Sequence, residues 1–258
     1  MGGLLSIMVS IMKNNEISSQ IMPKHIGIIM DGNGRWAQKR GLPRTAGHKM
    51  GIESLKKIVS FSGEIGIEVL TVYAFSTENW KRPQEEVSIL MSLIIEYIKK
   101  ELNVLHKNGV KINPIGEYQQ LPEKTVKEIN KAIEKTKDNT KLTLNVALNY
   151  GSKAEITKGV QKIAEKIIKG EISPNEIDEK MISNHLYTKN QPDPDLIIRP
   201  SGEKRLSNFL MWQGAYSELW FSNVLWPDFS EEHLMEAIKE FQNRDRRFGG
   251  VKEKEKGE

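Results

Sequence analysis

The sequence predicts an α/β fold in a single domain, with a mostly parallel central β-sheet flanked by helices. Short apolar runs of strand length alternate with longer stretches of helical periodicity, which is the order typical of βαβ units. The 258 residues suffice for a full core, since a chain of this size buries roughly 70–75% of its unfolded surface. Neither an internal repeat nor a low-complexity linker divides the chain.

The first half of the chain supplies four expected strands and two expected helices. A helix with Leu55, Ile58 and Val59 on one face closes near Gly66, and a second helix covers residues 87–102. The strands cover residues 25–30, 68–75, 110–115 and 141–148.

The second half continues the alternation. A helix ends at Gly170 and has its apolar positions at Ile156, Val160, Ile163, Ala164 and Ile167. Ser173 and Pro174 predict an N-cap followed by proline at the first helical position. Strands are expected at residues 195–198 and 218–225, and Ser230 should cap a last helix.

Composition narrows the function classes. The chain has no cysteine, which excludes disulfides, thiolate metal sites and cysteine nucleophiles and fits a cytoplasmic location. The net charge of +4 suits an anionic substrate or an anionic membrane surface, but it is too weak to indicate nucleic acid. No apolar stretch reaches the ~18 residues that a spanning helix needs. We expect residues 1–21 to be a disordered extension, residues 22–250 the catalytic domain, and residues 251–258 a charged disordered tail.

Polar residues gather directly after three of the expected strands. The segment DGNGR follows residues 25–30, STENWKR follows residues 68–75, and RPSGEKRLS follows residues 195–198. Since ligands bind outside the carboxyl ends of strands in open parallel sheets, these three segments should meet at one site.

The first of these segments is suited to holding an anion. Gly32 and Gly34 allow a tight turn and a close approach of backbone amides to phosphate, and Asp31 is a hard oxygen ligand of the kind that Mg²⁺ uses. A plain turn with aspartate as a helix cap is the better explanation of such a segment when it stands alone. The spacing matches neither a Walker loop nor a Rossmann fingerprint.

Arg44 and His48 lie one helical turn apart if Pro43 is the first residue of their helix. Together they offer a second hold on a diphosphate, although a solvated helix face is the simpler interpretation of the pair alone.

Residues 76–83 place hydroxyls, an amide, an indole and a guanidinium in one loop, which is costly to order without a ligand, although helix capping explains part of the pattern. The following helix is apolar nearly all round, so it is either buried in the core or lines an apolar cavity.

Residues 199–207 form the most basic segment. Arg199 ends a buried strand, where an unpaired charge is expensive, and Arg199 and Arg205 can each bind phosphate oxygens through two N–H groups. Glu218 is a carboxylate in an apolar stretch, and both a metal ligand and a structural ion-pair partner remain open for it.

Taken together, the segments HIGIIMDGNGRWA, FSTENWKRP, IIRPSGEKRLSNFLMWQ and RRFGG, with Arg44 and His48 between the first two, closely resemble the bacterial cis-prenyltransferases of the undecaprenyl diphosphate synthase family. The resemblance runs from about residue 22 to residue 250 with every segment in the same order. It implies a fold with a hydrophobic tunnel beside the sheet.

The resemblance also implies roles for individual residues. Asp31 matches the essential Mg²⁺-binding aspartate, Asn79 matches the residue proposed to accept or relay a proton, and Glu218 matches a second Mg²⁺ contact. The remaining matches are to substrate-binding positions: a phosphate cradle of Gly32, Asn33, Gly34 and Arg35 with Trp36 beside it, an allylic diphosphate site at Arg44 and His48, a closing loop with Ser76, Thr77, Glu78, Trp80 and Arg82, and an isopentenyl diphosphate site at Arg199, Arg205, Leu206 and Ser207. One departure is Lys204, where some relatives have histidine, which puts a histidine metal contact in doubt.

The implied activity is Mg²⁺-dependent condensation of isopentenyl diphosphate onto an allylic diphosphate such as farnesyl diphosphate. The implied product is a long-chain polyprenyl diphosphate, with undecaprenyl diphosphate for the cell-wall lipid carrier as the expected case. The expected partner is a second copy of the chain, which forms a homodimer. A peripheral contact with the inner face of the plasma membrane is also expected, and binding of nucleic acid is not. The length of the product's prenyl chain depends on the depth of the tunnel, so the sequence alone does not give it.

The sequence disfavours three rival functions. A phosphatase or nucleotide kinase could use the same anion cradle, but the sequence has neither a nucleophile motif nor a P-loop. A non-catalytic prenyltransferase subunit would lose active-site residues, whereas Asp31, Asn79, Arg199 and Arg205 are all present. A trans-type synthase is disfavoured because no D-D-x-x-D motif occurs.

Overall fold

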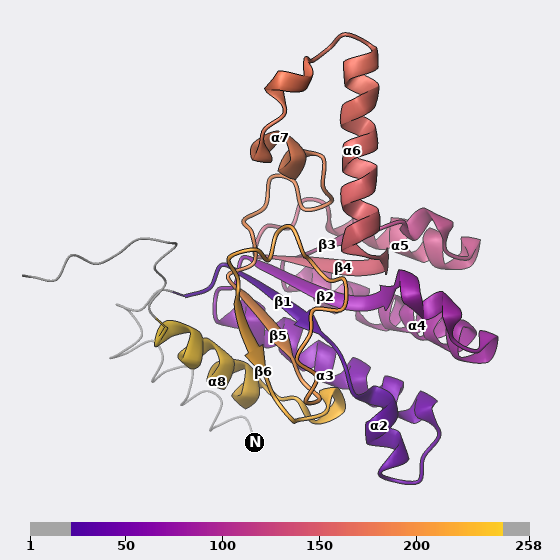
Figure 1. Ribbon diagram of the computed structural model, residues 1–258. Coiled ribbons are helices and arrows are strands. Elements are labelled where there is room, and N and C mark those ends of the chain that lie inside the picture. Colours follow the sequence, from indigo (N-terminus) through magenta and orange to yellow (C-terminus); the bar gives the residue numbers. More distant parts are fainter. Residues whose placement is uncertain (1–21, 245–258) are drawn as a thin grey trace, which may run out of the picture.

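One sheet of six strands runs through the computed structural model, which describes residues 22–244 (Figure 1). The strand order is β3-β4-β2-β1-β5-β6, and every neighbouring pair is parallel. The strands are β1 (His25–Ile29), β2 (Val69–Ser76), β3 (Val110–Ile115), β4 (Leu142–Tyr150), β5 (Leu196–Arg199) and β6 (Glu218–Phe221). The predicted parallel α/β sheet is therefore confirmed.

Seven helices accompany the sheet within the described residues. They are α2 (Asn33–Gln38), α3 (Arg44–Glu64), α4 (Gln84–Lys107), α5 (Glu123–Thr136), α6 (Ser152–Ile168), α7 (Glu179–Asn184) and α8 (Glu231–Gln242). Single 3-10 turns occur at η1 (Thr77–Lys81), η2 (Tyr118–Gln120), η3 (Pro174–Glu176) and η4 (Trp226–Asp228). The expected disordered ends and the RRFGG segment lie outside the part of the chain that the structure describes.

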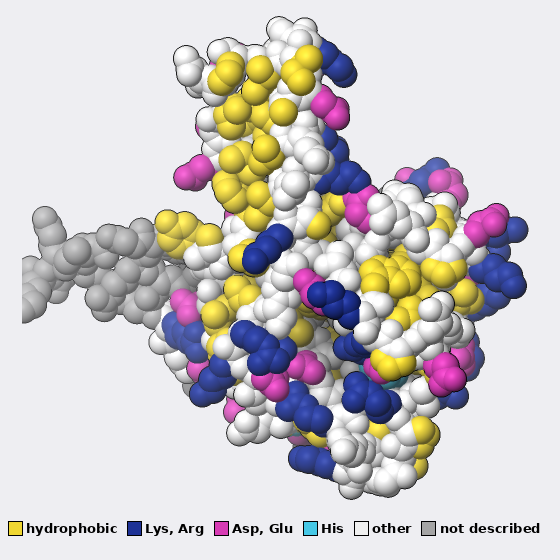
Figure 2. All heavy atoms as spheres, turned by 45° about the vertical axis from the view of Figure 1, so that its right-hand side comes forward, with side chains coloured by type: hydrophobic (Ala, Val, Ile, Leu, Met, Phe, Trp, Pro, Cys, Tyr) yellow, Lys and Arg dark blue, Asp and Glu magenta, His cyan; other side chains and the backbone are white. Residues whose placement is uncertain are grey.

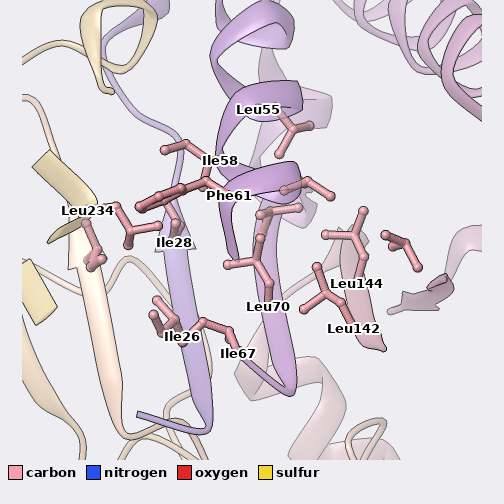
Figure 3. Close-up of a cluster of buried hydrophobic side chains, with 14 of the residues drawn as sticks. Ile26, Ile28, Leu55, Ile58, Phe61, Ile67, Leu70, Leu142, Leu144 and Leu234 are labelled. Carbon is pink, nitrogen blue, oxygen red and sulfur yellow. The ribbon is translucent and has the colours of Figure 1, made fainter. Parts of the chain in front are cut away.

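The main core lies between one face of the sheet and the helices α3, α4, α5 and α8. Figure 3 shows side chains from β1, β2 and β4 meeting α3, with Leu234 of α8 closing one side. Ile58 and Leu70 are fully buried there. Because α3 and α4 are held against the same face, their first turns come to the carboxyl edge of the sheet, where the strands β1 and β2 end.

The opposite face carries a smaller apolar cluster around Phe209 and Leu210, which approach the backbone of Gly27 on β1. A polar row crosses this face. His25 bonds Thr71 at 2.7 Å, and Asn145 donates to the same hydroxyl at 2.9 Å. His25 also bonds the Pro192 carbonyl at 2.7 Å and Asn145 donates to Gln191 at 2.6 Å, so these buried polar groups have the partners that burial requires.

Two expected boundaries are wrong in detail, and a third expected start is confirmed. The last strand stops at Phe221 and does not reach residue 225, because the chain turns there and the carbonyls of Ser222 and Val224 accept hydrogen bonds from the 201–202 loop. Pro43 is the N-cap of α3 and not its first residue. Ser173 and Pro174 do form a capped start, but it opens only the single turn η3.

Helix α6 begins directly after β4 and projects away from the sheet, with α7 beside it (Figure 1). We call these two helices and the segment between them, residues 152–184, the arm. No described helix is both long and apolar enough to cross a membrane.

Candidate functional site

A single cavity of about 1030 Å³ opens at the carboxyl ends of β1, β2 and β5. All three polar segments of the sequence contribute to its lining, as predicted. The predicted residues that line it are Asp31, Gly32, Asn33, Gly34, Arg35, Arg44, His48, Ser76, Glu78, Asn79, Arg82, Arg199, Arg205, Leu206 and Ser207. Figure 2 shows basic and acidic side chains gathered on the face beneath the arm.

Asp31 stands where β1 ends and is tied to a buried arginine. Its Oδ2 accepts a hydrogen bond from Arg199 at 2.9 Å, and its Oδ1 accepts one from the backbone of Gly32 at 2.7 Å. Burial raises the pKa of Asp31, but Arg199 and the smaller contributions of Ser201 and Gly32 outweigh it, so the pKa lies below its usual value. The carboxylate is therefore ionised at neutral pH and faces the cavity.

No group of three or more acidic or histidine side chains capable of holding a metal occurs among residues 22–244. Asp31 is thus a single hard ligand at an anion-binding cavity. This donor set fits Mg²⁺, which is usually bound by one or two carboxylates with substrate phosphates and water completing its shell.

The glycine-rich turn brings backbone close to the cavity. Gly32 has φ of +101°, a conformation that side-chain-bearing residues rarely adopt, and a Cβ on Gly34 would lie 2.8 Å from the guanidinium carbon of Arg44. The sequence prediction of a tight turn is confirmed, and Gly34 also makes room for Arg44. The helix that follows, α2, has only six residues.

The two arginines of the β5 segment are held differently. Arg199 is 4% exposed, and it donates to Ser207 at 2.7 Å and to the carbonyl of Arg205. Arg205 is paired with Glu203 and its side chain is largely exposed. The loop carries four non-glycine residues with positive φ, at Ser201, Ser207, Asn208 and Leu210, and such strained backbone is concentrated at functional sites.

Arg44 and His48 face the cavity from the first two turns of α3, as predicted. Glu86 of α4 lies 3.5 Å from Arg44 Nε and 3.6 Å from His48 Nε2, and it accepts a hydrogen bond from Arg82 at 2.8 Å. Burial and the charge of Arg82 lower the pKa of His48, and Arg44 lowers it further, against the opposing effect of Glu86. The imidazole is therefore neutral at pH 7.

Asn79 lines the cavity, but its side-chain oxygen is already used. It accepts the backbone N–H of Ser76 at 3.0 Å and so closes the capping box of η1. The amide nitrogen is left as the group that can act on a ligand, and it is a donor.

Four predicted site residues do not line the cavity. Trp36 donates to Asp228 at 2.7 Å beneath Arg40, and Trp80 packs on Phe75 while donating to Asn149 at 2.8 Å. Thr77 lies in η1 without reaching the cavity wall. Lys204, whose role the sequence left open, does not line it either.

Glu218 is the fourth predicted site residue that does not line the cavity, after Trp36, Thr77 and Trp80. It lies away from Asp31 in the described chain. It is the first residue of β6, paired in register with Leu196 at the start of β5, whereas Asp31 follows the end of β1. Its carboxylate pairs with Arg244 at 2.7 Å. Within this chain Glu218 is therefore an ion-pair partner of Arg244. Its contact with Mg²⁺ stays a prediction.

Beyond the polar mouth, the cavity is lined by apolar side chains. They come from α3, α4, α5 and the strands β3 and β4, and they are Ile52, Leu55, Leu90, Leu93, Ile94, Tyr97, Ile98, Ile112, Pro114, Ile129, Leu144, Val146 and Leu148. The sequence left open whether the apolar helix 87–102 is buried in the core or lines an apolar cavity. Part of α4 lies in the core and part lines this cavity.

Sequence reasoning missed two residues that the site uses, Glu86 and Glu203. Glu86 and Glu203 hold arginines, and Ser201 accepts two hydrogen bonds from Arg35, at 2.7 Å and 2.8 Å. Ser201 and Glu203 stand inside a predicted segment. Glu86 gave no signal because an acidic residue in the first turn of a helix is ordinary.

Comparisons with known proteins agree with the geometry. Residues 29–249 match the prenyltransferase family model for undecaprenyl diphosphate synthases. An isoprenyl transferase from Clostridium perfringens is 56% identical over 246 residues, which cover 93% of this chain and 97% of that protein. One from Clostridium acetobutylicum is 59% identical over 242 residues, which cover 93% and 94%.

A solved structure shares the fold as well. The lavandulyl diphosphate synthase from Lavandula x intermedia, in complex with dimethylallyl diphosphate, matches with a TM-score of 0.86 and 35% identity over 88% of this chain and 98% of that one.

Proposed function

This chain belongs to the cis-prenyltransferase family of undecaprenyl diphosphate synthases and isoprenyl transferases, and from that premise we propose that it is a Mg²⁺-dependent synthase of undecaprenyl diphosphate. The proposed starter is farnesyl diphosphate, which the enzyme lengthens with isopentenyl diphosphate units to make a cell-wall lipid carrier. One observation carries the proposal: arginines suited to diphosphates and a long apolar lining belong to the same cavity.

The two diphosphates take separate parts of the mouth. We assign the allylic diphosphate to Arg44, His48 and the glycine-rich turn, and the isopentenyl diphosphate to Arg199, Arg205 and Ser207. Guanidinium groups bind phosphate oxygens bidentately, which fixes orientation as well as charge. The growing hydrocarbon then occupies the apolar lining, from which water is excluded.

In the reaction, the allylic carbon–oxygen bond breaks and diphosphate leaves with the bonding electron pair. The isopentenyl double bond forms the new carbon–carbon bond, and a proton is lost to give a cis alkene. Asp31 and the substrate phosphates would hold Mg²⁺, which when bound supplies positive charge to the leaving diphosphate. The arginines of the mouth stabilise the same developing charge.

Asn79 is proposed to position the diphosphate that accepts the proton, and not to act as the base. A neutral amide is very weakly basic, and its oxygen already accepts a hydrogen bond from Ser76. The amide nitrogen donates to a diphosphate oxygen in this scheme, and the diphosphate itself is the proton acceptor.

Incorporation of radiolabelled isopentenyl diphosphate into a lipid-extractable product tests the activity. We expect incorporation with farnesyl diphosphate, loss of it on chelation of Mg²⁺, and a fall of about 100-fold or more in kcat for Asp31→Asn. Asp178→Asn is the matched control, because asparagine keeps its capping role at α7 far from the cavity. Full turnover by a folded Asp31→Asn enzyme would contradict the proposal, and phosphate release without incorporation would favour the phosphatase alternative.

We also infer a homodimer that is formed through the arm. Large apolar side chains are exposed there, with Val160 51% and Ile168 85% accessible, and Figure 2 shows hydrophobic side chains along the arm. Contiguous apolar exposure of this kind is typical of an interaction surface. Light scattering should give twice the chain mass of 29.4 kDa, and a monomer at micromolar concentration would refute this assignment.

The cytoplasm, with peripheral contact at the inner face of the plasma membrane, is the proposed location. The absence of cysteine and the net charge of +4 support it. Vesicle flotation with anionic lipid checks the membrane contact, and equal flotation with neutral lipid would argue against an electrostatic contribution.

A further inference from the structure

Glu86 brings together three basic side chains from separate parts of the chain. Arg82 follows η1, while Arg44 and His48 lie on α3, and all three lie within 3.6 Å of the Glu86 carboxylate. The three basic residues line the cavity, whereas Glu86 does not. Its side chain is only 13% exposed, so it is not an ordinary surface ion-pair partner.

The cluster needs this carboxylate when no anion is present. Two guanidinium groups close together repel each other, and a nearly buried acid is stable only where it is paired. Burial raises the pKa of Glu86, but Arg82, Arg44 and His48 lower it more, so the group is ionised. In the absence of substrate, Glu86 is therefore the negative charge around which these side chains are arranged.

A simpler explanation is that Glu86 only stabilises the start of α4 through the helix dipole. That explanation applies equally to Glu85, which also lies in the first turn, is exposed, and makes no ion pair with a described residue. The dipole does not account for the placement of two arginines and a neutral histidine around one carboxylate. Glu85 therefore supplies a matched comparison for the same change of charge.

We propose that Glu86 is a positioning residue for the allylic diphosphate: it holds Arg44, His48 and Arg82 toward the cavity without touching the substrate itself. The proposal rests on the proposed function. Its physical basis is preorganisation, since two-pronged recognition of phosphate by arginine depends on the orientation of the guanidinium before binding.

Removing Glu86 has two opposing effects on anion binding. The mouth becomes more positive, which strengthens attraction at long range, but the arginines lose the contact that orients them. We expect orientation to dominate, because the Glu86 carboxylate that accepts the Arg82 hydrogen bond is only 13% exposed, while long-range attraction is screened by salt. The affinity for the allylic substrate should therefore fall.

The experiment compares Glu86→Gln with Glu85→Gln and the wild type in steady-state kinetics. For Glu86→Gln we expect the KM for farnesyl diphosphate to rise about tenfold, with the KM for isopentenyl diphosphate and kcat changed by less than about threefold. Glu85→Gln should match the wild type. Glu86→Asp, which keeps the charge, should recover part of the lost affinity.

Two results would overturn the proposal: a KM for farnesyl diphosphate that stays unchanged or falls, or equal increases in both KM values together with a lower melting temperature. If Glu86→Gln does not fold, Glu86→Asp decides, since displacement of the carboxylate by one methylene should still raise the KM for farnesyl diphosphate selectively. Absence of incorporation by the wild type would instead refute the proposed function.

Discussion

His25 shows at the residue scale how the fold sets the charge state of a side chain. Its imidazole is fully buried, bonds Thr71 at 2.7 Å and bonds the Pro192 carbonyl at 2.7 Å. Burial lowers the pKa of His25 to about 4, although the Pro192 carbonyl and Asp195 act in the opposite direction. The sheet therefore holds a neutral histidine in its interior across the physiological range.

This lowered pKa predicts a loss of stability in acid. Below the unfolded pKa of about 6.5 the unfolded chain binds a proton that the folded chain excludes, so stability falls as pH drops from about 6.5 to about 4. The lowered pKa of His25 corresponds to about 3 kcal/mol of folding free energy, which is fully present above pH 6.5 and is lost as the pH falls to about 4. Urea unfolding at pH 7 and pH 4.5 should show a smaller pH dependence for His25→Gln than for the wild type, and identical dependences would refute it.

A site residue could be predicted from the sequence only where a side chain able to bind phosphate or metal also lies at or near the end of a predicted strand. Asp31 follows β1, Arg199 ends β5 and Arg205 lies in the loop after β5, so the sheet topology places all three at one edge. Glu86 required the crossing of α3 and α4 to be known, because its partners at positions 44 and 48 are remote in sequence. Glu218 matched a motif, yet its position at the start of β6 depends on register, which no motif reveals.

At the scale of elements, the position of the site depends on how closely α3 packs against the turn after β1. A Cβ on Gly47 would lie 1.9 Å from the backbone oxygen of Asn33, and one on Gly51 would lie 2.2 Å from its side-chain oxygen. Trp226 completes the contact by donating to the carbonyl of Gly51 at 2.8 Å. Small residues one turn apart thus bring Arg44 and His48 to the phosphate turn.

A helix that must approach so closely cannot accept a methyl group at this contact. Gly47→Ala should destabilise the protein by about 1–3 kcal/mol and weaken diphosphate binding, because the backbone at Asn33 must move. Gly63→Ala in the same helix is the control: its Cβ would meet nothing nearer than 3.8 Å, so it should stabilise by roughly 0.5–1 kcal/mol. Thermal unfolding of both variants checks this, and equal effects would contradict the packing argument.

Strands and helices were predicted correctly where the apolar residues follow a regular pattern between clear turn signals. The five strands from β1 to β5 begin and end within two residues of expectation, since each is a short apolar run between turn signals. Helix α5 was missed because its apolar stripe, made of Val126, Ile129, Ala132 and Ile133, is narrow within a segment rich in charged residues. The short helices α2 and α7, with six residues each, are too brief for periodicity to show.

At the scale of the whole molecule, the sheet separates two kinds of surface within one cavity. The strand ends and the first two turns of α3 supply the charged mouth, and the later turns of α3 together with α4 supply the apolar lining. Position along α3 therefore orders the chemistry, from phosphate binding at Arg44 and His48 to hydrocarbon binding at Ile52 and Leu55. The central claim is that a prenyl chain grows from the mouth into that lining.

The mass distribution of products made from farnesyl diphosphate and isopentenyl diphosphate, compared between the wild type and Ile94→Trp, tests this claim most directly. Ile94 lines the cavity and is half-buried, so the larger indole fills cavity space and not the core. The account predicts that products will differ by whole isoprene units and that Ile94→Trp will shift them to shorter chains while the enzyme remains active. An active Ile94→Trp enzyme with an unchanged product distribution would contradict the account.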